Sequence, residues 1–210
     1  MHPTFVRPLV ATEAARPPRG PGWLFEPKFD GYRFQVVKDG RRVRLFSKSG
    51  AEYTDRLPGM VDAFVEVRAR SLVVDGELCS ISANGQATFE RLHREMRTRW
   101  PDEEELVLIM FDLLHADGAD LKQLPLIERR RELVKLFRKS PLPRMRLIQT
   151  FTDGDALFEH CARFGFEGIV AKKVDRPYVS GRSKCWVKVK CPEWKRGNQE
   201  RFKLFEGHAR

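Results

Sequence analysis

The alternation of apolar and polar residues predicts several β-strands separated by turn signals. Two β-rich runs flank Asp39-Gly40 in the stretch YRFQVVKDGRRVRLFS, and Asp-Gly between such runs is typical of a hairpin. Further strands are predicted in SLVVDGELCSIS, ELVLIMFDLL, FEGIVAKKV and CWVKVK. Residues 11–22 are rich in proline, glycine and arginine, which predicts an extended lead-in.

Three other segments have the apolar spacing of amphipathic helices. They are LPGMVDAFVEVRAR, LPLIERRRELVKLFRKS and DGDALFEHCARFG. The third ends at Gly165, the residue type expected just past a helix C-terminus. Because strands and helices are mixed without regular βαβ alternation, the predicted fold class is α+β.

Composition narrows the class of protein. The chain has 210 residues, of which 41% are hydrophobic, so it can bury a core as one large domain or two small ones. A membrane span would need a run of about 18 apolar residues, and the sequence has none. The first residues also lack the apolar region of a secretory signal. We therefore expect a cytoplasmic protein with no membrane contact.

The cysteines and the common short motifs point to no local site. The four cysteines have no C-x-x-C spacing, and we expect them to be reduced and structural: Cys79, Cys161, Cys185 and Cys191. The sequence contains no G-x-S-x-G, G-x-x-x-x-G-K-[ST] or G-x-G-x-x-G, so typical hydrolase, P-loop and dinucleotide sites have no local support.

The charge favours a polyanionic partner. The formal net charge is +10, and residues 172–190 hold seven lysines or arginines against one acid, Asp175. A positive field of this kind favours nucleic acid, although a solvated basic face is the alternative.

Charged residues also interrupt the apolar strands in five places. They are Lys28 and Asp30, Asp75 and Glu77, Asp112, Glu167, and Lys188 and Lys190. Because strand side chains alternate, the members of the second and fifth sets each share one face. Each pair alone could be an edge-strand salt bridge. Together, lysines for phosphate and carboxylates for Mg²⁺ predict a site for a nucleoside triphosphate and its metal.

Six stretches in order resemble the motif set of covalent nucleotidyltransferases. They are KFDGYR (28–33), SKSG (47–50), VDGEL (74–78), FDLL (111–114), EGIVAK (167–172) and WVKVK (186–190). More narrowly, they resemble the adenylation domain of ATP-dependent DNA ligases, and most of all bacterial ligases of the end-joining type, which work with Ku. The resemblance covers about residues 5–190. It implies a nucleotidyltransferase domain over residues 1–190, with mixed, largely antiparallel sheets flanked by helices.

The resemblance implies that Lys28 is the nucleophile. It would attack the α-phosphate of ATP, release pyrophosphate and carry AMP on its side-chain nitrogen. The AMP would pass to a DNA 5′-phosphate, and a neighbouring 3′-hydroxyl would displace it to seal the strand. An ammonium cannot attack, and nearby cations (Lys188, Lys190 and Mg²⁺) would favour the neutral amine.

Other roles follow from the resemblance position by position. On the nucleoside side, Glu26 would read the adenine, Phe111 and Val170 would lie on its two faces, and Arg33 would contact ribose or phosphate. On the phosphate side, Lys188 and Lys190 would bind the α-phosphate, Glu167 would bind Mg²⁺ or Mn²⁺, and Glu77 would bind a metal or the ribose. Asp30 would orient Lys28 or an arginine. Plain core is the alternative for Phe111, and Asp112 is interpreted as a structural residue.

Two departures from the family pattern change these expectations. Lys48 stands where the family usually has arginine, so a contact to ribose or phosphate loses the bidentate fork. The family also continues into an OB-fold domain of about 70 to 100 residues, whereas 20 residues follow WVKVK here. We expect residues 191–210 to form a short basic amphipathic tail without an OB-fold.

The resulting expectation is a monomeric ATP-dependent DNA ligase-type enzyme that acts on nicked or broken duplex DNA in repair. Ku or another chain would supply an OB-fold or a DNA clamp. One alternative is an RNA ligase or a GTP-using capping-type relative, which shares the lysine motif. The other is a non-catalytic or partner-dependent subunit that binds nucleotide or DNA.

Overall fold

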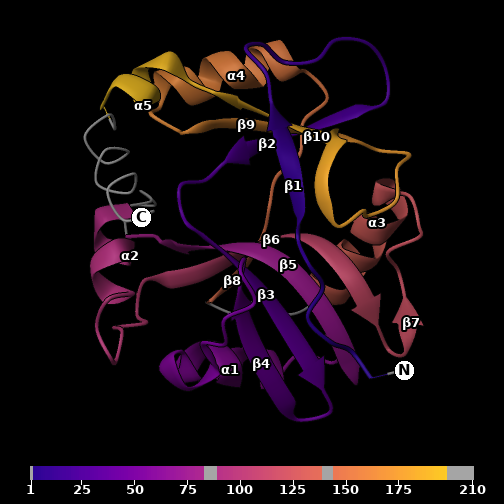
Figure 1. Ribbon diagram of the computed structural model, residues 1–210, viewed down its shortest axis with the longest axis vertical. Helices are drawn as coiled ribbons and strands as arrows, with labels where there is room; N and C mark the ends of the chain where they lie inside the picture. Colours follow the sequence, from indigo (N-terminus) through magenta and orange to yellow (C-terminus); the bar gives the residue numbers. More distant parts are fainter. Residues whose placement is uncertain (1, 83–88, 139–143, 198–210) are drawn as a thin grey trace. The chain divides into compact units, whose positions relative to one another are not determined.

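The computed structural model describes residues 2–82, 89–138 and 144–197, and it confirms the predicted α+β class (Figure 1). The chain divides into two compact units, which are described separately. Unit 1 comprises Met1–Val10, Asp30–Ile148 and Val174–Ser183, and unit 2 comprises Ala11–Phe29, Gln149–Lys173 and Lys184–Arg210. In the described part of the chain, no helix is long and apolar enough to cross a membrane.

The sheet of unit 1 has the strand order β4-β3-β5-β6-β7, and β8 pairs with β6. Its strands are β3 (Tyr32–Asp39), β4 (Arg42–Ser47), β5 (Ser71–Ser80), β6 (Leu106–Ala116), β7 (Ala119–Asp120) and β8 (Met145–Leu147). The β6–β8 ladder is parallel and the other four are antiparallel, as the mixed, largely antiparallel prediction requires. The predicted hairpin is present, and Gly40 turns it with a φ of 60°.

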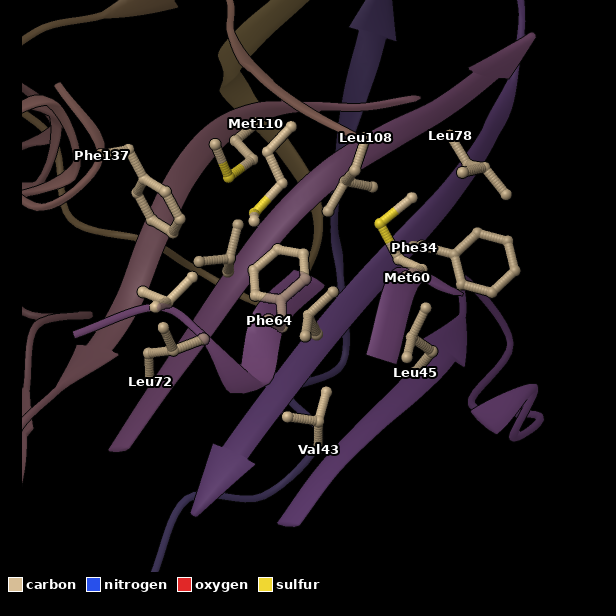
Figure 2. Close-up of a cluster of buried hydrophobic side chains, with 14 of the residues drawn as sticks. Phe34, Val43, Leu45, Met60, Phe64, Leu72, Leu78, Leu108, Met110 and Phe137 are labelled. Atoms are coloured by element: carbon tan, nitrogen blue, oxygen red, sulfur yellow. The ribbon is translucent and has the colours of Figure 1, made fainter. Parts of the chain in front are cut away.

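Helices cover the apolar face of this sheet. They are α1 (Pro58–Val65), α2 (Phe89–Glu95) and α3 (Leu126–Phe137), with a short 3₁₀ turn at Thr54–Arg56. Figure 2 shows the core that they form with the sheet, where Met60 and Phe64 of α1 lie among Phe34, Leu72 and Phe137. Because strand side chains alternate, Phe34, Val36, Val74 and Leu78 face this core, and their polar neighbours face the opposite side.

The first helix ends earlier than its apolar spacing predicts. A buried lysine, Lys38 of β3, donates hydrogen bonds to the carbonyl oxygens of Phe64, Val65 and Val67. These carbonyls lie at or just beyond the C-terminus of α1, where the lysine amine adds a donor to them. Burial lowers the pKa of Lys38, so the contacts come at a desolvation cost.

A second buried charge joins α3 to the sheet. Arg129 and Asp112 are both 0% exposed, and the guanidinium binds the carboxylate through two hydrogen bonds of 2.8 Å. The remaining terminal nitrogen of Arg129 donates to the carbonyl oxygens of Leu124 and Arg176, at 2.7 and 3.2 Å. Asp112 therefore has a structural role, which was the interpretation of this residue from the sequence.

The sheet of unit 2 has the strand order β1-β10-β9-β2. The strands are β1 (Leu9–Glu13), β2 (Trp23–Lys28), β9 (Gly168–Lys173) and β10 (Gly181–Lys190), and the boundary between the units falls within β1 and β10. Both neighbours of β9 pair with it antiparallel. Part of the predicted extended lead-in, residues 11–13, therefore belongs to a strand that the proline-rich sequence did not predict.

Helix α4 (Gly154–Arg163) packs on one face of this sheet (Figure 1). Asp153 caps its N-terminus by accepting a hydrogen bond from the Ala156 amide at 3.0 Å. Gly165 follows its last turn with a φ of 75°, as predicted. The apolar contacts join Leu157 and Cys161 of α4 to the sheet residues Phe25, Ile169, Ala171 and Val189.

The expected tail begins with a short helix, α5 (Pro192–Gly197). Trp194 of α5 packs against the same apolar cluster as α4. The rest of the predicted amphipathic pattern, including Phe202 and Phe205, lies outside the described residues.

Candidate functional site

The face of the unit 2 sheet opposite α4 carries most of the predicted site residues of this unit. Phe25, Ile169 and Val189 face the helix, so alternate residues of β2, β9 and β10 face away from it. The strand registers align these residues in three rows across the sheet: Lys28, Gly168 and Lys190; Glu26, Val170 and Lys188; and Leu24, Lys172 and Trp186.

A carboxylate joins the two lysines of the first row. Glu167, directly before β9, contacts Lys28 Nζ with Oε2 at 2.7 Å and Lys190 Nζ with Oε1 at 2.9 Å. The Glu167 side chain is 5% exposed, whereas that of Lys28 is 22% exposed. The lysine amine is therefore held by a buried acid and is still accessible to a ligand from solvent.

Glycine is required between these two lysines. Gly168 has a φ of 152°, and a Cβ atom built there would overlap the carbonyl oxygen of Val189. Such a backbone conformation is strained for any residue with a side chain. The Glu-Gly pair of the sequence thus places the carboxylate of Glu167 at the start of β9 and keeps the middle of the row empty of side-chain atoms.

The second row contains the two predicted nucleotide contacts of β2 and β9, and one of the two lysines of β10. Glu26 lies directly opposite Val170, and Val170 lies opposite Lys188. Lys188 Nζ is 3.4 Å from Glu13 Oε2 of β1, and both side chains are partly exposed. This exposed pair leaves Lys188 close to solvent, as a contact to phosphate requires.

A second ion pair on this face is completely buried. Lys172 Nζ lies 2.6 Å from Glu26 Oε2, and each side chain is 2% exposed. The same amine lies 4.0 Å from the ring centroid of Trp186. Sequence reasoning missed Lys172 and Trp186, although their period-two spacing from Gly168 and Lys188 would have placed them on this face.

Unit 1 holds the other predicted site residues. Arg33, Glu77 and Phe111 lie on the side of its sheet opposite the core, whereas Asp30 and Lys48 lie outside the strands. Arg33 binds Asp75 through two hydrogen bonds of 2.9 and 2.6 Å and also donates to the carbonyl oxygen of Leu9. The Tyr178 hydroxyl donates to Asp75 at 2.8 Å. Burial and the negative charge of Asp75 raise the pKa of Tyr178, so the hydroxyl stays protonated.

Phe111 and Glu77 lie next to this arginine. The guanidinium carbon of Arg33 is 5.3 Å from the centroid of the Phe111 ring, which is 8% exposed. Glu77 is the residue opposite Arg33 in the β3–β5 ladder. Unit 1 thus brings Arg33, Glu77 and Phe111 together. Tyr178 was missed from the sequence because no local pattern connects it to β3 or β5.

Lys48 lies in the exposed turn that follows β4. Ser47, the preceding residue, accepts a hydrogen bond from Gly50 at 2.9 Å and closes the turn. The exposure of Lys48 is compatible with a phosphate contact, and its predicted role stays a prediction.

The donor set for a metal ion is sparse. In the ranges that the structure describes, no group of three or more His, Cys, Asp or Glu side chains could hold a metal by itself. Mg²⁺ bound with a nucleotide usually takes one or two protein carboxylates and completes its shell with phosphates and waters. Glu167 fits such a role, whereas an all-protein metal site does not fit these residues.

Known proteins share both the sequence pattern and the fold. The sequence pattern of the ATP dependent DNA ligase domain family matches residues 8–190. The multifunctional non-homologous end joining protein LigD of Pseudomonas aeruginosa is 31% identical over 191 residues, or 90% of this chain. A DNA ligase of Thermococcus onnurineus is 32% identical in an alignment of 201 residues that covers 88% of this chain. The chain spans 22% and 36% of the length of these two relatives.

Two solved structures resemble the chain along most of its length. The ligase domain of M. tuberculosis LigD superimposes with a TM-score of 0.75 at 30% identity, covering 87% of this chain and 60% of that one. A mycobacterial DNA ligase D complexed with ATP and MES gives a TM-score of 0.72 at 28% identity, covering 87% and 59%. The arrangement of α+β elements is thus that of ligase adenylation domains. With the family pattern matched from residue 8 to residue 190, the chain is a member of the ATP-dependent DNA ligase domain family.

Proposed function

We propose that the chain forms a covalent lysyl-AMP at Lys28 and passes the AMP to the 5′-phosphate of a DNA strand for sealing. The observation that carries this proposal is the first row of the unit 2 sheet. A partly exposed lysine amine lies 2.7 Å from a buried carboxylate, and a second lysine binds the other oxygen of that carboxylate. ATP is proposed as the nucleotide because the matching family is that of ATP-dependent DNA ligase domains.

The first step is nucleophilic substitution at phosphorus. The neutral Lys28 amine attacks the α-phosphorus of ATP, a nitrogen–phosphorus bond forms, the bond to pyrophosphate breaks, and the nitrogen releases a proton to solvent. Lys190 and Lys188 carry positive charge on the same face of the sheet, where they stabilise negative charge on the transferring phosphate. Val170 lies between Glu26 and Lys188 and offers an apolar surface to the nucleoside.

Glu167 is the residue that would hold Mg²⁺ brought with the nucleotide. Held by Glu167, the ion would supply positive charge that offsets the charge of the phosphates. Glu167 contacts both lysines, so it also sets the distance between the nucleophile and the second cation. On unit 1, we assign Arg33 to the ribose or a phosphate, Glu77 to the ribose or a metal, Phe111 to the adenine ring and Lys48 to the ribose or a phosphate.

The later steps concern DNA. The lysyl-AMP donates its AMP to a 5′-phosphate, and an adjacent 3′-hydroxyl then displaces AMP and joins the strands. Three exposed basic residues of the segment 172–190, Arg176, Arg182 and Lys184, supply charge for the DNA backbone. Similarity to a multifunctional end-joining protein supports a place in the repair of broken duplexes. We further propose Ku or another chain as the partner.

The direct test is intact-mass spectrometry of the purified chain. The protein is first treated with pyrophosphate to remove resident AMP, and is then incubated with Mg²⁺ and either ATP or GTP. We expect a gain of one AMP from ATP, none from GTP, and peptide mapping to place the adduct on Lys28. A GMP adduct would identify a capping-type enzyme, and the absence of any adduct would contradict catalysis by this chain alone.

A Glu167→Ala variant tests the metal assignment. We expect the rate of lysyl-AMP formation at saturating Mg²⁺ to fall about 10²-fold, since one charge-stabilising group is removed, with no change in the preference for ATP. The Glu159→Ala variant is the control, because Glu159 is exposed on α4. Rates are measured across a magnesium titration for both variants. An unchanged titration curve for Glu167→Ala would remove this residue from the metal site.

A further inference from the structure

The buried pair of Glu26 and Lys172 has no role in the chemistry just described. Its ions lie 2.6 Å apart, both side chains are 2% exposed, and Trp186 covers the amine. Moving two charges out of water costs free energy that their attraction often fails to recover, so such a pair is weak evidence for stability. A buried pair in the middle of a functional face therefore calls for another explanation.

We propose that Glu26 and Lys172 are positioning residues that fix the register of β2 and thereby hold Lys28 in place for reaction. The proposal rests on the proposed function and adds to it. It assigns the Glu26 carboxylate to Lys172 in place of a direct contact with the adenine.

Glu26 and Lys172 are diagonal neighbours in the β2–β9 ladder, so their contact depends on the register of the two strands. Glu26 lies opposite Val170 and Leu24 lies opposite Lys172, so the ion pair links two neighbouring rows of the β2–β9 ladder. A slip of β2 by one residue would turn Glu26 toward the apolar α4 side and leave Lys172 buried without its acid. The charge pair therefore disfavours a slip of β2 by one residue in either direction.

The end of β2 has few other restraints. The strand lies at the edge of the sheet, so its backbone ladder runs along β9 alone. On the outer side, Phe25 exchanges two hydrogen bonds of 2.9 Å with Phe151. Two residues later, Pro27 has no N–H to extend this outer pairing. Glu26 lies between Phe25 and Pro27, and its side chain forms an ion pair with Lys172 of β9.

Pro27 also links the Glu26–Lys172 ion pair to Lys28 along the backbone. Its ring fixes φ, so the backbone between Glu26 and Lys28 has little freedom. Lys28 is thereby held opposite Gly168, with its amine beside Glu167. A displacement of about 1 Å at a reacting group can cost about 10²-fold in rate. Loss of the Glu26–Lys172 ion pair should thus slow lysyl-AMP formation without weakening the binding of ATP.

The neighbouring lysine provides a matched control. Lys173 is next to Lys172 on β9 but faces the other side of the sheet, and its amine lies 4.4 Å from the ring centroid of Trp23. Both lysines thus lie over a tryptophan. Lys172 is 1% exposed, whereas Lys173 is half-buried and donates to the carbonyl oxygen of Pro21.

The test compares Glu26→Leu/Lys172→Met with Lys173→Met in the full chain. The double variant removes both charges, so no unpaired buried ion is left to lower the stability. Three quantities are measured: the Tm, the single-turnover rate of lysyl-AMP formation at saturating ATP and Mg²⁺, and the Kd for ATP. The Kd is measured in a Lys28→Ala background, where no adduct forms.

For the double variant we expect a rate at least about 10-fold below wild type, a Kd within about threefold and a Tm within a few degrees. Lys173→Met should match wild type in all three. The charge-reversed variant, Glu26→Lys/Lys172→Glu, should recover part of the rate.

A wild-type rate in the double variant would overturn the proposal and leave the pair a purely structural one. A loss confined to the Kd would also overturn it, and would return Glu26 to the adenine. If the double variant does not fold, Lys172→Arg moves the charge while keeping it, and a wild-type rate there would count against positioning. Failure of the proposed function is distinct, since wild type itself would then form no adduct.

Discussion

The Lys28→Ala variant should lose covalent labelling by AMP, by at least about 10³-fold, while its Tm stays close to that of wild type. The loss is expected to be complete in practice, because removal of a nucleophile leaves no atom to carry the intermediate. The fold should survive because Glu167 keeps its second partner, Lys190, at 2.9 Å. Labelling is measured by intact mass after pyrophosphate treatment and a fresh charge of ATP and Mg²⁺.

Lys190→Ala and Lys173→Ala complete this comparison. Lys190→Ala keeps the nucleophile and should still form adduct at a reduced rate, since a charge near the phosphate is lost. Lys173→Ala lies on the other side of the sheet and should react as wild type does. Labelling retained in Lys28→Ala would assign the nucleophile to another residue, and a variant that failed to fold would show as a lowered Tm.

The elements that the sequence predicts well are those whose pattern is local. Asp39-Gly40 between two alternating runs suffices for the hairpin, and the apolar spacing suffices for α3 and α4. The strand at residues 9–13 was missed because it borders a segment dominated by proline and arginine, where no alternation is visible. The ladder that orders it is formed with β10, about 170 residues later in the chain.

In the candidate site, too, the sequence predicts what depends on local pattern and misses what depends on tertiary contacts. The alternation of β10 correctly puts Lys188 and Lys190 on one face, and the family motifs lead to Lys28 and Glu167. The interaction partners of these residues could not be predicted, because they depend on pairing between segments that are distant in the sequence. The sequence does not show that Asp75 binds Arg33 and Tyr178, or that Lys172 binds Glu26.

Buried charges explain most of these misses. Charged residues are usually interpreted as exposed, since they are seldom fully buried unless paired. In this protein Lys38, Asp75, Asp112, Arg129 and Lys172 are all at most 3% exposed. Each has a partner supplied by a different element, so its position follows from the tertiary structure and not from local sequence.

The buried Arg129 should be the most sensitive of these positions for stability. Replacing it by methionine is expected to lower the free energy of unfolding by about 3 to 5 kcal/mol, because Asp112 would keep a buried charge without its partner. The carbonyl oxygen of Leu124 would also lose its arginine donor, and that of Arg176 would keep only the Leu126 amide. Urea unfolding followed by circular dichroism measures this difference.

The neighbouring Arg131 offers a control on the same helix. Its ion pair with Glu128 is also short, at 2.6 Å, but the two side chains are 67% and 44% exposed. Exposed pairs contribute about 0 to 1 kcal/mol, so Arg131→Met should change stability by no more than that. The contrast tests burial as the cause, since helix, residue type and partner type are the same.

A double variant, Asp112→Leu/Arg129→Met, separates the cost of a lone charge from the worth of the pair. Removing both charges should recover a large part of the stability lost in Arg129→Met, because no ion is then left in the core. If the double variant were as unstable as the single one, packing of the arginine side chain would be the main contribution. Equal stability of Arg129→Met and Arg131→Met would show that the buried pair contributes nothing.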